Sequence, residues 1–247
     1  MTSYEFMRWL TFPLMTTHLV VVRNDIKRLL KTHTSSNFRM SILDVGGRKS
    51  PYTIHVPADV TLLDVPQESG TKQALNLGFT DSILTTIQKK RSNISDVIIQ
   101  DMTHSSLPAG SYDAVVSIEV IEHVEADDLF VKHIAQVIKK GGWAYFTTPN
   151  GDFIKNEGPG RNPDHVRHYT RQELHDLLSQ YFDAVDVHYA VSTGTYRVWS
   201  LQSLKTINPI KFMQSLLGTL VNRYQSKGVE QRSQNTAHLV AVAYKDH

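Results

Sequence analysis

The chain has 247 residues, a formal net charge of +2 and no cysteine. The weak charge argues against an electrostatic nucleic-acid partner, and the missing cysteines exclude disulfides and thiolate metal ligands. At this length we expect a single domain with a sizeable core and some appendages. A signal peptide is not indicated, and the most apolar stretch, residues 9–22, is too short to span a bilayer. We therefore expect a cytoplasmic protein.

The N-terminal region is predicted to be helical. Residues 4–32 are expected to form one helix, because apolar side chains recur at helical spacing at Leu19, Val22, Ile26, Leu29 and Leu30. A polar linker follows at 32–37. We assign residues 1–36 to an N-terminal helical cap and residues 37–192 to the core.

Apolar segments that suit strands alternate with helical patterns along the core. The predicted strands are 41–45, 59–63, 96–100, 113–117, 143–147, 182–189 and, after the core, 238–244. The predicted helices are 82–90, 126–140, which Gly141 and Gly142 are expected to end, and a helix that begins at the capping box of Thr170 and Glu173. The charged run 89–91 is expected to lie in solvent. This alternation predicts an α/β fold with a doubly wound, mostly parallel, seven-stranded sheet whose last strand is antiparallel.

A glycine turn follows the first predicted strand. Asp44 stands just before Gly46 and Gly47, which allow a positive φ and let a ligand approach the backbone. Asp64 and Asp101 end the next two strands, and the carboxyl ends of parallel strands open onto one crevice. Each of these residues also suits an ordinary turn.

The order of these motifs resembles the class I S-adenosylmethionine-dependent methyltransferases. The first motif is Ile42-Leu43-Asp44-Val45-Gly46-Gly47, and the most specific is Ser111 to Ser117 followed by Glu119-Val120-Ile121-Glu122-His123-Val124. That run is similar to the branch that contains the ubiquinone-biosynthesis O-methyltransferases, as are 140–143, 147–150 and 165–170. The resemblance implies S-adenosylmethionine as the cofactor, with Asp64 on the ribose, Asp101 and Met102 beside the adenine, and Glu119 behind the methionine end. The family usually has a glycine where this chain has Arg48, which either folds outward or pairs with the cofactor's carboxylate.

Three histidines are candidate catalytic residues: His123, His165 and His168. If the chain turns helically after the fourth strand, Glu119, Glu122 and His123 share one face. The small-RNA 2′-O-methyltransferases hold a metal with a similar cluster and a later histidine. By that likeness His165 would be the fourth ligand here. The alternative, which we prefer, is that His123 positions a loop and no metal is bound. At least one of His165 and His168 is expected to face the acceptor.

The segment 193–235 separates the last two predicted strands, and 236–247 forms the final one. Within 193–235, apolar residues recur at helical spacing after Pro209: Phe212, Met213, Leu216, Leu217, Leu220 and Val221. We expect most of this face to pack on the domain and the segment to form a lid over the acceptor. Membrane contact is the weaker alternative, because the basic cluster is thin and no lipidation motif is present.

Methyl transfer from a sulfonium requires alignment of donor and acceptor. We expect a small-molecule acceptor, an oxygen of a sugar, a lipid precursor or a secondary metabolite. The alternative is a non-catalytic protein that keeps the fold and binds the cofactor or acts as a scaffold.

Overall fold

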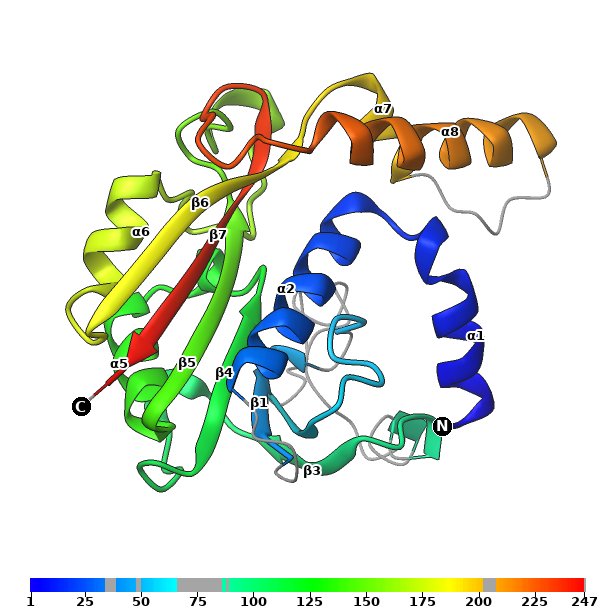
Figure 1. Cartoon of the computed structure of the whole chain (residues 1–247). Helices are drawn as coiled ribbons and strands as arrows, with labels where there is room; N and C mark the ends of the chain where they lie inside the picture. Colours follow the sequence, from blue (N-terminus) through cyan, green and yellow to red (C-terminus); the bar gives the residue numbers. More distant parts are fainter. Residues whose placement is uncertain (34–38, 48–49, 66–85, 88, 202–207, 247) are drawn as a thin grey trace.

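The computed structural model shows a seven-stranded sheet with strand order β3-β2-β1-β4-β5-β7-β6 (Figure 1). The strands are β1 (Ser41–Val45), β2 (Asp59–Asp64), β3 (Ile94–Ile99), β4 (Tyr112–Ile118), β5 (Ile138–Pro149), β6 (Ala184–Ser192) and β7 (Thr236–Lys245). The first five pair in parallel, and β7 is antiparallel to both β5 and β6. This confirms the predicted doubly wound sheet and its antiparallel last strand. The structure describes residues 1–33, 39–47, 50–65, 86–87, 89–201 and 208–246.

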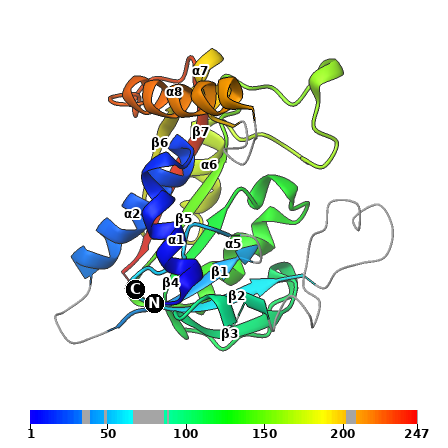
Figure 2. The ribbon, with the colours of Figure 1, turned by 90° about the vertical axis from the view of Figure 1, so that its right-hand side faces the viewer.

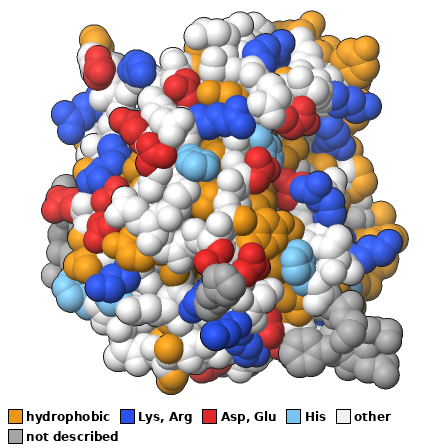
Figure 3. Space-filling model, turned by 60° about the vertical axis from the view of Figure 1, so that its left-hand side comes forward, with side chains coloured by type: hydrophobic (Ala, Val, Ile, Leu, Met, Phe, Trp, Pro, Cys, Tyr) orange, Lys and Arg blue, Asp and Glu red, His pale blue; other side chains and the backbone are white. Residues whose placement is uncertain are grey.

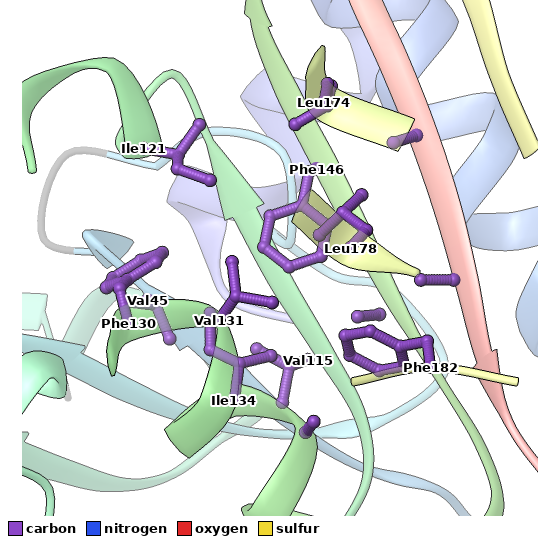
Figure 4. Packing of buried hydrophobic residues seen from close by; sticks show 14 of the residues in the cluster. Val45, Val115, Ile121, Phe130, Val131, Ile134, Phe146, Leu174, Leu178 and Phe182 are labelled. Carbon is purple, nitrogen blue, oxygen red and sulfur yellow. The ribbon is translucent and has the colours of Figure 1, made fainter. Parts of the chain in front are cut away.

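Helices cover both faces of the sheet, because the side chains of the central strands alternate between two cores. On one face, Leu43 and Phe146 pack with α5 (Asp127–Val137) and α6 (Arg171–Leu178), as Figure 4 shows for ten labelled side chains. On the other, Ile42 and Tyr145 pack with α2 (Thr17–His33). Val22 and Ile26 of α2 are fully buried.

Two predicted helices differ from those in the structure. Residues 4–32 form two helices, α1 (Ser3–Thr11) and α2, because Pro13 lies in a 3₁₀ turn, η1 (Phe12–Leu14), between them. The helix predicted over 126–140 ends at Val137, where β5 begins. Gly141 and Gly142 lie inside β5 rather than ending a helix, and Gly141 uses its positive φ where β5 changes register against β4. The predicted helix 82–90 lies mostly outside the described residues.

The segment between β6 and β7 contains α7 (Thr195–Ser200) and α8 (Pro209–Gln225), which lie together at one end of the sheet (Figure 1). The predicted packing of the apolar face of α8 on the domain holds only for Phe212, Leu216 and Val221, which are half-buried. Met213, Leu217 and Leu220 are exposed, while Ser215 and Asn222 on the opposite face are buried. None of the described helices is both long and apolar enough to cross a membrane.

Candidate active site

The turn after β1 requires glycine at two positions. Gly46 has a φ of +74°, and a Cβ there would lie 2.5 Å from Cγ2 of Val120. A Cβ at Gly47 would lie 2.9 Å from the Leu62 side chain and 3.0 Å from the carboxyl carbon of Asp44. The Gly46 amide donates to the Leu63 carbonyl, 2.8 Å away, which fixes the turn at the end of β2. The glycines therefore let the turn fit between its neighbours. Arg48 lies outside the described residues.

Asp44 is buried beneath this turn. Its carboxylate accepts a 2.5 Å hydrogen bond from Thr53 Oγ1, and Arg91 Nη2 donates to the same hydroxyl at 2.8 Å. Burial raises the pKa of Asp44, opposed by the Thr53 hydrogen bond and the Arg91 charge. The prediction that the run 89–91 is solvated is wrong for Arg91, whose side chain belongs to this buried network. Asp44 thus holds the loop at Thr53 in place.

The other predicted cofactor residues end neighbouring strands. Asp64 is half-buried at the end of β2, and one carboxylate oxygen accepts from the Val65 amide at 2.9 Å. Asp101 is exposed and caps a 3₁₀ turn, η3 (Met102–His104), by accepting from the Thr103 amide and hydroxyl, each at 2.8 Å. Met102 is buried in the core. The order β3-β2-β1-β4 brings these strand ends to one edge.

Glu119 follows β4 in a left-handed conformation, with a φ of +54°. Its Oε1 accepts from Thr147 Oγ1 at 2.8 Å and lies 3.2 Å from His238 Nδ1 and 3.8 Å from His18 Nε2. Burial alone would raise the pKa of Glu119, but His238 and His18 outweigh it and hold that pKa well below its usual range. We call these three ionisable residues the Glu119 cluster.

Contacts of the two histidines fix their roles in the Glu119 cluster. Arg197 Nη2 donates to His238 Nε2 at 3.1 Å, so the Nδ1–H of His238 donates to Glu119. The imidazole of His18 stacks on that of His238, with ring centroids 4.1 Å apart and planes inclined by 4°. Burial and His238 lower the pKa of His18 to about 3, so it is neutral near pH 7. Two parallel rings cannot both direct an in-plane lone pair at one ion, which makes this cluster a poor metal site.

A second group of ionisable side chains surrounds Glu122 in the 3₁₀ turn η4 (Ile121–His123). Ligand atoms of Glu122, His123 and His165 all lie within 4.8 Å of one another, and we call these three residues the Glu122 cluster. Glu122 is buried, and its carboxylate lies close enough to the Thr148 hydroxyl and to its own backbone amide for both to oppose the rise of its pKa. Burial and then Glu119 raise the pKa of Glu122 well above its usual range.

Both histidines of the Glu122 cluster have their tautomers set by neighbours. His123 Nδ1 donates to the Asp164 carbonyl at 2.8 Å, which leaves Nε2 with a lone pair. His168 Nδ1 donates to the Ile154 carbonyl at 2.7 Å, so its Nε2 accepts from His165 Nδ1, also at 2.7 Å. The Nε2 of His165 is then also a free acceptor. Burial, His123 and His168 lower the pKa of His165 to about 4. His168 has both nitrogens occupied and therefore orients His165.

The structure separates residues that the sequence placed together. The chain makes a 3₁₀ turn only from Ile121, so Glu119 does not share a face with Glu122 and His123. The two clusters are nevertheless neighbours, as the effect of the Glu119 charge on pKa values shows. That charge adds to the rise in the pKa of Glu122 and partly opposes the fall in the pKa of His165. Together they line the edge of the sheet where β4 and β5 end.

Two members of the Glu119 cluster, His18 and His238, were not predicted as site residues. Neither was Arg197, which contacts His238. His238 had a usable signal, because in an antiparallel last strand it pairs with Pro149 at the carboxyl end of β5. His18 and Arg197 come from the N-terminal cap and α7, and no local pattern indicated where those helices would dock.

Comparison with known proteins identifies the family. A family signature described as "Methyltransferase domain" matches residues 19–205, most of the chain. The chain belongs to the methyltransferase family. Among curated relatives, ubiquinone biosynthesis O-methyltransferases of Escherichia coli and Shigella boydii are 31% identical over 86 residues, or 34% of this chain. The chain spans 36% of the length of those relatives.

Several solved structures share the fold. An S-adenosylmethionine-dependent methyltransferase of Thermotoga maritima covers 98% of this methyltransferase, and 95% of its own chain, with a TM-score of 0.56 and 12% identity. Phosphoethanolamine N-methyltransferase 2 of Haemonchus contortus, in complex with S-adenosylmethionine, covers 91% of this chain and 53% of its own, with a TM-score of 0.55 and 14% identity. A [4+2]-cyclase covers 90% of this chain and 80% of its own, with a TM-score of 0.53 and 15% identity. The fold is thus the class I, Rossmann-like one and the cofactor is S-adenosylmethionine, whereas the fold leaves the acceptor open.

Proposed function

We propose that this methyltransferase transfers the methyl group of S-adenosylmethionine to an oxygen of a small molecule, such as a sugar, a lipid precursor or a secondary metabolite. The observation that supports it is the pair of carboxylate–histidine clusters beside the strand ends that form the cofactor crevice. A hydroxyl acceptor needs a base that removes its proton or a metal ion that lowers its pKa. The Glu122 cluster offers a candidate base and candidate metal ligands.

In this proposal the cofactor lies along the ends of β1, β2 and β4. Asp44, Gly46 and Gly47 shape the turn, while Asp64 binds the ribose and Asp101 and Met102 lie beside the adenine. Glu119 faces the methionine end, where its negative charge favours the sulfonium. The chain acts as one domain in which α7 delivers Arg197 to the acceptor side.

His165 is the proposed general base. Its Nε2 carries a lone pair, and His168 orients the ring. The lowered pKa keeps His165 neutral near pH 7 but makes it a weaker proton acceptor than a free imidazole, so its role as base depends on its position beside the acceptor. His123 holds the loop at Asp164, and its ring packs edge-on against that of His165, with centroids 4.7 Å apart. The step moves the acceptor proton to His165 as the acceptor oxygen attacks the methyl carbon in line with the departing sulfur.

A divalent metal ion fits the Glu122 cluster on two observations. Its ligand atoms all lie within 4.8 Å of one another, and the tautomers of both imidazoles are set by their neighbours. Glu122, His123 and His165 would hold the ion, which when bound would lower the pKa of the acceptor hydroxyl. His165 would then be a ligand rather than the base.

Two measurements test the proposal. Calorimetric titration with S-adenosylhomocysteine should show binding that Asp64→Asn weakens and Asp59→Asn, at the far end of the same strand, leaves unchanged. A screen of hydroxylated acceptors for release of the demethylated cofactor should then find turnover that His165→Gln abolishes. His175, which is partly exposed and lies on α6, provides the matched control, His175→Gln. Binding without any turnover across the screen would favour the non-catalytic alternative, which the comparisons do not favour.

Elemental analysis distinguishes the two roles of His165. Protein purified without chelator should contain about one equivalent of a divalent metal, which His123→Gln loses and His175→Gln keeps. If the protein is metal-free and fully active in chelator, the metal is excluded and His165 stays the base.

A further inference from the structure

The α8 helix turns its apolar side outward. Exposed apolar residues recur at intervals of three and four, which places them in one stripe along the helix. They are Ile210, Met213, Leu217, Leu220 and Tyr224, each about half exposed or more. Such a stripe in a soluble protein marks an interaction surface, and we call it the α8 stripe.

Packing on the opposite side of α8 fixes this orientation. A Cβ at Gly218 would lie 2.6 Å from Cβ of Trp199 and 2.7 Å from the Ser200 amide, so α7 contacts the backbone of α8 there. Asn222 Nδ2 donates to the Ser192 carbonyl at 2.7 Å, at the end of β6. Because the small and polar residues are committed to these contacts, α8 cannot rotate its stripe inward.

The N-terminal α1 helix repeats this arrangement. Its carboxylate at Glu5 is buried and accepts from the Ser92 amide at 2.7 Å, while Phe6, Met7, Trp9 and Leu10 are exposed. Arg223 Nη2 of α8 donates to the Pro13 and Met15 carbonyls, at 2.9 and 3.0 Å, and so ties α8 to the turn after α1. Figure 2 shows α1 and α8 on the same side of the molecule.

The charge around these helices has one sign. No acidic residue occurs from 187 to 229, whereas Lys211 and Lys227 do. Two further basic residues of this range are engaged within the fold, Arg197 with His238 and Arg223 with the turn after α1. In α1 the sole acid, Glu5, is buried, and Arg8 is the basic residue. The face turned forward in Figure 3, by contrast, mixes acidic and basic side chains. The surface is therefore apolar and basic without exposed carboxylates on α1, α7 or α8.

We propose that the α8 stripe, extended by α1, docks this methyltransferase on an anionic lipid surface. Apolar side chains with Trp, Tyr and basic residues are what a helix lying in a membrane interface requires. A second copy is disfavoured, because a two-fold interface would place the same basic patch against itself. The proposal does not depend on the acceptor.

Flotation of the full chain with vesicles tests this directly. Binding to vesicles of equal parts phosphatidylglycerol and phosphatidylcholine should exceed binding to pure phosphatidylcholine and should fall as salt is added. The triple variant M213Q/L217Q/L220Q should bind at least about tenfold more weakly, since it removes three apolar anchors while glutamine keeps helix propensity. Lys211→Gln with Lys227→Gln should weaken binding to the anionic vesicles alone.

The control is Leu129→Gln, an exposed apolar residue on α5, which should bind as wild type does. Circular dichroism and thermal unfolding must show that each variant is folded. Equal flotation of wild type and the triple variant, or no flotation of either, would overturn the proposal. So would a dimer in sedimentation that the triple variant dissociates, because a second copy would then cover the stripe.

Discussion

Gly46 combines two constraints at one residue. Its φ is positive, and a side chain there would meet Val120, which lies between Glu119 and Glu122. Gly46→Ala should therefore destabilise the fold by about 2 kcal/mol or more and weaken cofactor binding. Urea unfolding and calorimetric titration measure the two effects. Adding Val120→Ala should recover only the part due to the clash; full recovery would show that the backbone conformation carries no strain.

In the proposed site, Glu119 is the carboxylate assigned to the methionine end of the cofactor. Glu119→Gln keeps the shape and the acceptor for His238 Nδ1–H but removes the charge. It should weaken binding of the cationic S-adenosylmethionine about fivefold while changing that of neutral S-adenosylhomocysteine much less. Paired calorimetric titrations measure the ratio. An equal loss for both ligands would place Glu119 away from the sulfonium and limit it to holding His238 and Thr147.

At the scale of elements, the close contact of α7 and α8 controls where Arg197 lies. Gly218→Ala should force α7 away, cost about 1–3 kcal/mol of stability, and reduce acceptor turnover more than cofactor binding. The control is Gln225→Ala, on the exposed side of the same helix. Comparable kinetics for the two variants would mean that α7 does not contribute to the acceptor site.

The strands were predictable because buried parallel strands are continuous apolar runs with clear ends. Helix ends were harder, since Gly141 and Gly142 suit a helix terminus and a change of strand register equally well. The orientation of α8 could not be read from its periodicity, which shows that a helix has an apolar face but not which way that face turns. Gly218 decides this, and only by its contact with Trp199, which is distant in sequence.

The same limit applies to the candidate site. Glu119, Glu122 and His123 were identified by their spacing, but spacing assumed a regular helix where the chain has a left-handed residue followed by a 3₁₀ turn. Tertiary contacts place these residues in two clusters. Glu119 lies beside His18 and His238, whereas Glu122 and His123 lie beside His165. Arg91 similarly ended a charged run in sequence and lies buried beside Thr53 in the fold.

At the scale of the whole molecule, the two clusters make stability depend on pH. The pKa of His18 is lowered to about 3 and that of His165 to about 4, both from an ordinary value of 6.5. Between pH 6.5 and 4 the unfolded chain therefore binds protons at these positions that the folded chain does not. Stability must fall as the pH falls through this window, by up to about 1.4 kcal/mol per pH unit for each proton.

Glu122 acts in the opposite direction, because its raised pKa makes the folded chain hold a proton that the unfolded chain loses above about pH 4.5.

The contribution of Glu122 to the pH dependence and that of the histidines can be separated by variants. Thermal unfolding from pH 7 to pH 5 should show a clear decline for wild type and a shallower one for His18→Gln, since that variant removes a buried group faced by His238, Glu119, Arg197 and Tyr52. Glu122→Gln should steepen the decline, because it removes the opposing proton. The His175→Gln variant, at a partly exposed position, serves as the control and should follow wild type. Parallel slopes for wild type and His18→Gln would mean that His18 is protonated in the folded state, with Glu119 as the partner of its charge.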